Sequence, residues 1–120
     1  MQLKEYVELA RRTRSKLSTN WSDNIHMLLG MSTEIGELQD VYKKHLAYGK
    51  DIDLVNVQEE LGDLMWYIAG FCDVNGFDLD KILEINILKL AKRYPYSFTS
   101  DKAINRDTAE ERKILDELGY

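Results

Sequence analysis

The stretch LGDLMWYIAGFCDV, residues 61–74, is apolar on nearly every side when it is wound as a helix. A helix of this kind is buried by several neighbouring helices or by a second subunit. Asp51 or Asp53 is suited to cap its start, because a short carboxylate accepts hydrogen bonds from the free amides of a first helical turn. Asn75-Gly76 follows it and supplies a stop signal. The stretch therefore predicts the central helix of an all-α fold.

Helical spacing of apolar residues continues in the segments on both sides of this stretch. It occurs at about 2–17, 22–48 and 79–94. Ser22 or Asp23 is suited to cap the second of these segments. Each segment is joined to the next by a short connection, which favours antiparallel packing of neighbouring helices.

Stop signals and a capping pattern set the remaining boundaries. Gly49 ends the segment at about 22–48, and Pro95, the single proline, ends the segment at about 79–94. Residues 96–100 have the composition of a loop. A short helix is predicted from Thr108, because Thr108 and Glu111 fit a capping box. The sequence thus predicts an all-α, antiparallel helical bundle of four main helices plus a short C-terminal helix.

The length and composition indicate a single domain over residues 1–120. Apolar residues make up 44% and charged residues 31%, as in ordinary globular proteins, and the net charge of −5 argues against nucleic acid as a partner. The single cysteine, Cys72, excludes an internal disulfide and suits a reducing compartment. No apolar run approaches the roughly 20 residues that span a bilayer, and the charged beginning does not fit a signal peptide. We therefore expect a cytoplasmic protein with no membrane partner.

Two acidic pairs stand out in the segments TEIGE and EELGD. The pairs are Glu34 with Glu37 and Glu60 with Asp63. Within each pair the acids are three residues apart, so they project from one face of a helix. A glycine lies between the two acids, where a larger side chain would crowd an approaching ligand. The pattern indicates a binding site shared by two helices.

The sequence around these acids is apolar, and no basic residue stands three or four positions away inside either motif. Isolated carboxylates in such surroundings cost several kcal/mol each unless they are neutralised. If the two helices are neighbours, a metal ion is the simplest neutraliser for four converging acids. Hard oxygen ligands suit Mg²⁺, with Mn²⁺ as a substitute. The alternative interpretation is a set of solvated surface residues, as most glutamates on helices are.

The pattern Glu34-x-x-Glu37, then 22 residues, then Glu60-x-x-Asp63 resembles the signature of the MazG-like all-α nucleoside triphosphate pyrophosphohydrolases. The similarity covers roughly residues 22–95. It implies hydrolysis of a nucleoside triphosphate between its α- and β-phosphates, which gives a monophosphate and pyrophosphate. On this resemblance the four acids would hold one or more Mg²⁺ ions, and a water molecule would attack in line.

The resemblance extends to NILKLAKRYP, residues 86–95, which is similar to the Asn/Lys/Arg-Tyr-Pro segment of that family. Asn86, Lys89 and Arg93 fall on one helical stripe, and the resemblance implies that they contact the sugar and phosphates of the substrate. The other interpretation is a solvated polar face. The chain departs from the family at Thr33, where a further acid often stands.

Trp66 stands three residues after Asp63, close enough to share its helical face. Its ring could stack on the nucleobase of a substrate, although packing in the core is the other interpretation. A di-iron site of the bundle type is a poor alternative, since it requires a histidine three residues after a glutamate on two helices. A helical interaction module without catalysis is the other alternative. Whether the chain is an enzyme or an interaction module, the apolar helix that contains residues 61–74 predicts a homodimer or a homotetramer.

Overall fold

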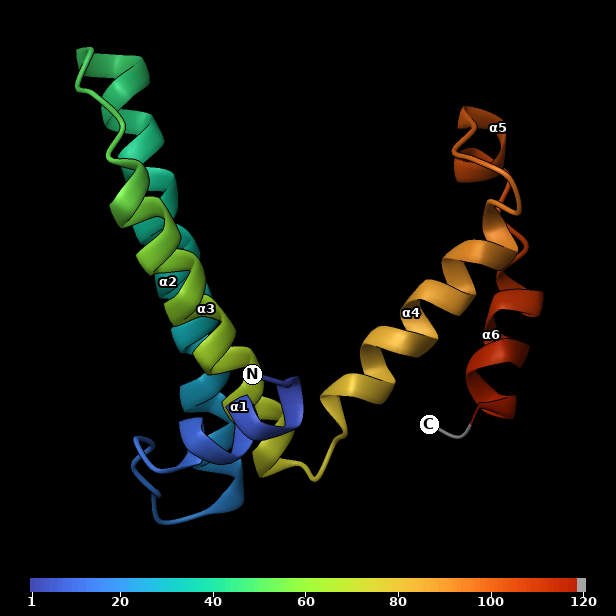
Figure 1. Ribbon diagram of the computed structural model, residues 1–120, viewed down its shortest axis with the longest axis horizontal. Coiled ribbons are helices and arrows are strands. Elements are labelled where there is room, and N and C mark those ends of the chain that lie inside the picture. The colour runs from blue at the N-terminus through green and yellow to red at the C-terminus, as the bar shows by residue number, and fades with distance from the viewer. Residues whose placement is uncertain (119–120) are drawn as a thin grey trace. The chain divides into compact units, whose positions relative to one another are not determined.

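Six helices and no strand occur in residues 1–118, the part of the chain that the computed structural model describes (Figure 1). The helices are α1 Leu3–Arg11, α2 Asn20–Tyr48, α3 Leu54–Val74, α4 Leu79–Arg93, α5 Ser100–Ile104 and α6 Thr108–Glu117. The prediction of an all-α fold is confirmed. None of these helices is both long and apolar enough to cross a membrane. The chain separates into two compact units, one ending at Asp78 and the other beginning at Leu79, and a single domain stays a prediction.

An antiparallel hairpin of α2 and α3 is the main feature of the first unit (Figure 1). The predicted end of α2 at Tyr48 is confirmed: Gly49 follows with a φ of 66°, in the left-handed region that favours glycine. Asp53 caps α3, because its side chain accepts hydrogen bonds from the amides of Val55 and Asn56 at 3.0 and 3.2 Å. The structure therefore selects Asp53 from the two predicted caps.

Two glycines allow α2 and α3 to approach closely. A Cβ atom at Gly30 of α2 would collide with the ring of Tyr67 on α3. A Cβ atom at Gly70 of α3 would lie 2.5 Å from the sulfur of Met27 on α2. Met27 and Ala69 are fully buried beside these contacts. The hairpin is thus held at a short interhelical spacing on the side where the acidic pairs lie.

The first helix is shorter than predicted. α1 ends at Arg11 instead of Leu17, because the residues after it make contacts with α3 that a continued helix would break. Arg14 donates to the carbonyl oxygen of Gly70 at 3.0 Å. Arg11 and Arg14 both form ion pairs with Asp73, at 2.6 and 2.9 Å. Tertiary contacts, rather than local helix preference, set the end of α1.

The start of α2 also differs from the prediction. Thr19 is the cap, and its hydroxyl accepts a hydrogen bond from the Ser22 amide at 3.0 Å. The prediction of Ser22 or Asp23 as the cap is wrong. The carboxylate of Asp23 instead accepts from the amide of Leu17 at 2.9 Å, which fixes the connection between α1 and α2.

The second unit contains α4, α5 and α6. The short helix α5 was not predicted, and Thr99 caps it within the segment read as a loop. Asp107 caps α6 by accepting from the Glu110 amide at 3.0 Å. The predicted capping box of Thr108 and Glu111 is therefore wrong, because the Glu111 carboxylate accepts hydrogen bonds from arginine side chains.

Candidate functional site

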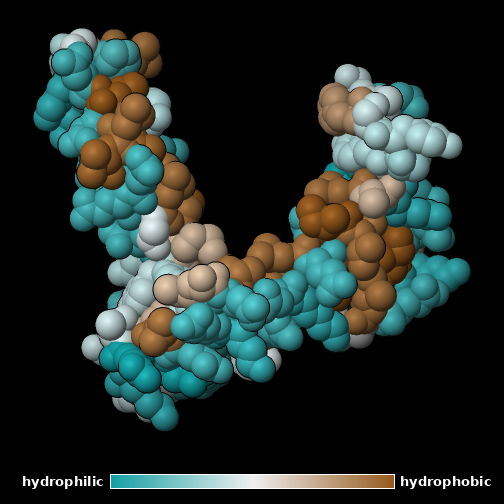
Figure 2. Space-filling view, in the orientation of Figure 1, coloured by the Kyte–Doolittle hydropathy of each residue, from teal (hydrophilic) through white to brown (hydrophobic). Residues whose placement is uncertain are grey.

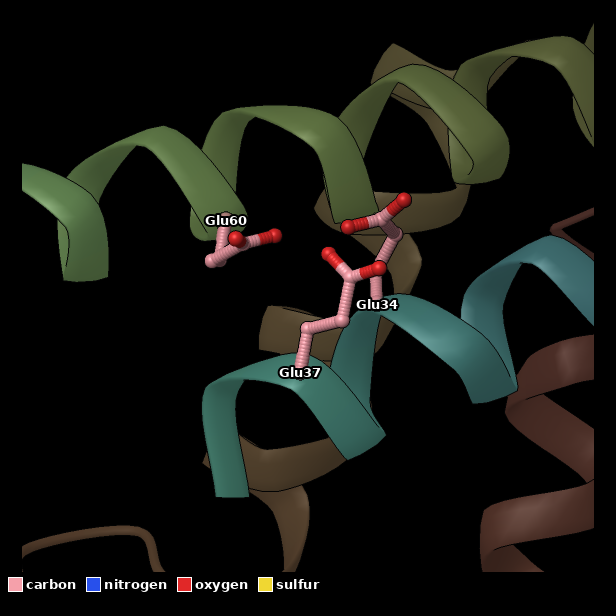
Figure 3. A group of neighbouring side chains, drawn as sticks. All are labelled: Glu34, Glu37 and Glu60. Carbon is pink, nitrogen blue, oxygen red and sulfur yellow. The ribbon is translucent and has the colours of Figure 1, made fainter. Parts of the chain in front are cut away.

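Three carboxylates meet between α2 and α3 (Figure 3). Glu34 and Glu37 come from adjacent turns of α2, and Glu60 faces them from α3. One oxygen of each residue lies within 4.8 Å of the others, so a single cation between them could contact all three. We call this group the carboxylate cluster. The hairpin thus brings together three of the four acids that the sequence selected.

Open space lies beside each acidic pair, at the glycine between its members. A Cβ atom added at Gly36 or at Gly62 would meet nothing within 4 Å. Gly30 differs, because a side chain at that position would collide with the ring of Tyr67 and prevent the helices from packing. The glycines of the two motifs therefore leave room for a ligand and are not required for contact between the helices.

No positive side chain neutralises the carboxylate cluster within residues 1–118. Glu34, Glu37 and Glu60 take part in none of the ion pairs that this part of the chain forms. Glu34 and Glu60 each have a buried Oε2 atom with no hydrogen-bond partner there. Because buried polar atoms are nearly always hydrogen-bonded, two such oxygens in one cluster favour a site for a bound cation. A set of oxygen ligands alone fits Mg²⁺ or Mn²⁺.

The surroundings of Glu34 and Glu60 raise the pKa of both carboxyl groups. Only a protonated Glu60 can donate to the nearby carboxylates of Glu34 and Glu37, and this, followed by burial, raises the pKa of Glu60 to about 7. The pKa of Glu34 is raised mainly by burial, and the negative charges of Glu37 and Asp63 add to the shift. A divalent cation would reverse this effect, because it favours the ionised form of every carboxylate around it.

Asp63, the fourth predicted acid, lies beside the carboxylate cluster instead of within the group of three. It lines a cavity of about 270 Å³ together with Glu34, Trp66 and Tyr67. We call this the aromatic cavity. Because Glu34 belongs to both the cavity and the cluster, Asp63 is placed where it can act on a ligand that extends from one to the other.

Two rings form a wall of the aromatic cavity. Trp66 and Tyr67 meet edge to face, with ring centroids 5.0 Å apart. The indole nitrogen of Trp66 donates to the Thr13 hydroxyl at 2.8 Å, so the ring is held in one orientation from the segment after α1. Trp66 is partly exposed and is not enclosed in the core. Its position leaves it available for the predicted contact with a base.

A second and larger cavity, of about 790 Å³, lies on the other side of the carboxylate cluster. Glu37 and Glu60 line it together with Gly36. Its far end is lined by Lys44 and Lys50, close to the turn that joins α2 to α3. We call this the lysine cavity. The cluster is therefore bordered by the aromatic cavity and by a cavity that contains two lysines as well as five carboxylates.

The three polar residues predicted to contact substrate lie on α4 in the second unit. Asn86 is exposed and Lys89 is partly exposed. Arg93 binds Glu111 through two hydrogen bonds, Nε to Oε1 at 2.7 Å and Nη2 to Oε2 at 3.0 Å. Arg106 donates to the same carboxylate at 2.6 Å. Substrate binding by Asn86, Lys89 and Arg93 stays a prediction.

Sequence reasoning missed Tyr67, Lys44 and Lys50. A signal for Tyr67 was present, because it stands four residues after Asp63 and so shares its helical face. Lys44 stands seven residues after Glu37, two turns along the same helix. Lys50 carried no such signal, since its position depends on the turn after α2.

Comparison with known families gives one result, and it covers the helices that build the site. The model for the MazG nucleotide pyrophosphohydrolase domain matches residues 23–98, which include most of α2, all of α3 and all of α4. No curated protein and no solved structure matches the chain.

Proposed function

This chain belongs to the MazG nucleotide pyrophosphohydrolase domain family, and from that premise we propose that it is a Mg²⁺-dependent nucleoside triphosphate pyrophosphohydrolase. Its substrates would be ribo- or deoxyribonucleoside triphosphates, and its products the monophosphate and pyrophosphate. The observation that carries the proposal is the carboxylate cluster, in which buried oxygens of Glu34 and Glu60 have no hydrogen-bond partner among residues 1–118. Oxygens of this kind are suited to bind the divalent cation that accompanies a nucleotide.

In this proposal Glu34, Glu37 and Glu60 would hold Mg²⁺, and Asp63 would assist from the neighbouring position. When bound, the ion screens the negative phosphates and makes a bound water more acidic. The oxygen of a water molecule adds to the α-phosphorus, and the bond from that phosphorus to the bridging oxygen breaks. Pyrophosphate leaves with the electron pair of that bond. A carboxylate of the site accepts the proton that the water loses.

The remaining predicted contacts place the rest of the nucleotide. We propose that the base stacks on Trp66, whose ring is held by Thr13 at the wall of the aromatic cavity. Asn86, Lys89 and Arg93 are assigned to the sugar and phosphates, as the family resemblance implies.

A direct assay tests the proposed reaction. The protein is incubated with a panel of ribo- and deoxyribonucleoside triphosphates and Mg²⁺, and the products are separated by chromatography. We expect equal amounts of monophosphate and pyrophosphate from at least one nucleotide. Release of orthophosphate, or no turnover with any nucleotide, would contradict the proposal.

We also propose that the active form is a homodimer or a homotetramer. Apolar side chains are exposed along both helices of the hairpin, and Figure 2 shows hydrophobic surface there. Leu28, Ile35 and Tyr42 are seven residues apart on α2, as are Leu54 and Leu61 on α3, and these five are 43% to 64% exposed. Seven-residue spacing is the pattern by which one helix pair packs on another, so a second copy of the hairpin is a suitable partner.

Analytical ultracentrifugation at micromolar concentration tests this assembly. A dimer or tetramer is expected, and a monomer would contradict it. The same apolar face supports the second candidate function, a helical oligomerisation module without catalysis. Assembly with no turnover in the nucleotide assay would favour that candidate.

A further inference from the structure

The aromatic cavity and the lysine cavity follow one another along the hairpin, and residues of both α2 and α3 line each of them. On α2, Glu34 lines the aromatic cavity, while the lysine cavity begins beside it at Thr33 and continues through Glu37 to Lys44. On the antiparallel α3, Trp66 lines the aromatic cavity, and Glu60, which precedes it, lines the lysine cavity. The carboxylate cluster therefore lies between two spaces of different chemistry. A ligand that touches both cavities must cross the cluster.

A nucleoside triphosphate has ends that match this difference, with a flat aromatic base at one end and anionic phosphates at the other. Resting on the proposed function, we infer that the nucleotide lies along the hairpin with its β- and γ-phosphates in the lysine cavity, where Lys44 and Lys50 bind the departing pyrophosphate. Its base then occupies the aromatic cavity beside Trp66, and the α-phosphate lies over the cluster.

Five carboxylates line the lysine cavity beside its two lysines, and four of them are already engaged elsewhere. Asp40 accepts from Lys43 and Lys44, at 3.2 and 2.7 Å. Asp53 uses its carboxylate to cap α3. Glu37 and Glu60 belong to the proposed cation site. Apart from these four acids, the lining contains only one other carboxylate, Asp51.

Of the two lysines that line the cavity, Lys44 is paired with Asp40, and Lys50 is the one left to bind a ligand. It forms no ion pair within residues 1–118. Its backbone is nevertheless fixed, because its amide donates to the Lys44 carbonyl at 3.3 Å and its own carbonyl lies 2.9 Å from Nδ1 of His45. The left-handed turn at Gly49 sets this arrangement. A fixed backbone carrying an unpaired ammonium group is suited to bind phosphate oxygens.

The distance along α2 is also suitable. Glu37 and Lys44 are seven residues apart, or about 10 Å along the helix axis. Side chains on a helix lean toward its N-terminus, so Lys44 leans toward the cluster, in keeping with its ion pair to Asp40 one turn earlier. The β- and γ-phosphates of a nucleotide centred on the cluster would thus meet the ammonium group of Lys44.

Product binding tests this orientation without relying on turnover. Affinities of the Mg²⁺-loaded protein for pyrophosphate and for a nucleoside monophosphate are measured separately by isothermal titration calorimetry. We expect Lys50→Gln and Lys44→Gln each to weaken pyrophosphate binding by roughly tenfold, as loss of one charged hydrogen bond implies. Monophosphate binding should change by less than about twofold, since that product leaves the lysine cavity empty.

Lys43→Gln is the matched control, because Lys43 also pairs with Asp40 but does not line the cavity. It should leave both affinities unchanged. Unaltered pyrophosphate binding in both Lys44→Gln and Lys50→Gln would overturn the inference, as would an equal loss of affinity for both products. Failure of the proposed reaction is distinct, because it would appear as an unmodified protein that hydrolyses no nucleotide.

Discussion

Glu60 in the first unit and Glu111 in the second are both glutamates on helices, yet their surroundings shift their pKa values in opposite directions. Neighbouring glutamates raise the pKa of Glu60 to about 7. Hydrogen bonds from Arg93 and then Arg106 lower that of Glu111 to about 2. Glu111 is 5% exposed and has its partners within the chain, while the Oε2 atom of Glu60 is buried without one among the described residues. Glu111 thus stabilises the fold through its arginine partners, whereas Glu60 is suited to bind an added cation.

The strongest test of this contrast is Glu60→Gln, which removes one charge at nearly constant volume. We expect turnover to fall by at least about 100-fold, because a ligand of the proposed cation is lost. The fold should be kept, since the change also relieves repulsion with Glu34 and Glu37. Pyrophosphate release and thermal unfolding measure the two effects.

Glu59→Gln is the control for this change. Glu59 is the exposed neighbour of Glu60 and is not part of the carboxylate cluster, so its variant should keep full activity. Normal turnover by Glu60→Gln would show that the proposed ligand assignment is wrong.

Glu111→Gln should act mainly on stability, whereas Glu60→Gln should act mainly on turnover. The substitution leaves the partly buried guanidinium of Arg93 facing a neutral amide, and unpairing such a group is costly. We expect the midpoint of thermal unfolding to fall by on the order of 10 °C. Differential scanning calorimetry provides the measurement.

The adjacent, half-buried acid Glu110 gives the comparison variant. Glu110 reaches Lys92 only at 3.6 Å, and Glu110→Gln should shift the midpoint by less than about 2 °C. Equal shifts for the two variants would mean that the arginine pairs of Glu111 do not stabilise the second unit.

The stabilisation by Glu111 should also depend on pH. The pKa of Glu111 is about 2 in the fold against an ordinary value of 4.5, so its stabilisation is complete above pH 4.5 and is lost as the pH falls toward 2. The gap in unfolding midpoint between the unmodified chain and Glu111→Gln should therefore narrow by roughly 5 °C between pH 7 and pH 3. Calorimetry of both proteins across this range measures the gap. A gap that stays constant would contradict the proposed origin of the stability.

The smallest expected effect is the response to Mg²⁺. A cation that binds the folded state should raise the unfolding midpoint by roughly 2 to 5 °C at saturating concentration, and a chelator should reverse the shift. Glu60→Gln should lose this response, while Glu111→Gln should retain it. A response that survives in Glu60→Gln would place the bound cation elsewhere in the chain.

Local signals predicted much of the fold. The stop at Gly49 and a cap at Asp53 or Asp51 follow from the chemistry of single residues, and α2, α3 and α4 were located by apolar spacing. The end of α1 could not be predicted in this way. It depends on Arg14, which reaches the Gly70 carbonyl and Asp73 across 56 and 59 positions of the sequence. Contacts of such separation have no periodic signature.

The candidate site was likewise predictable only where local spacing determines it. The spacing of Glu34 and Glu37 placed both acids on one face, and the assumption that α2 and α3 are neighbours brought Glu60 to them. Arg93 and Glu111 show the limit of this reasoning. Glu111 was predicted as part of a helix cap, whereas the structure pairs it with Arg93 across two helices; the phosphate contact of Arg93 stays a prediction. Their pairing is set by packing in the second unit.

The close approach at Gly30 bears on the kind of cation that the proposed site would accept. Gly30 lies one turn before Glu34, and the ring of Tyr67 occupies the space that a side chain at position 30 would fill. The absence of a side chain at Gly30 lets α2 and α3 approach closely, and the three glutamate oxygens lie within 4.8 Å of one another. A small ion such as Mg²⁺ binds its oxygens at about 2.0 to 2.1 Å, whereas Ca²⁺ needs about 2.3 to 2.6 Å. Selection by ionic radius would then depend on a single hydrogen atom in place of a methyl group, one turn away from any ligand.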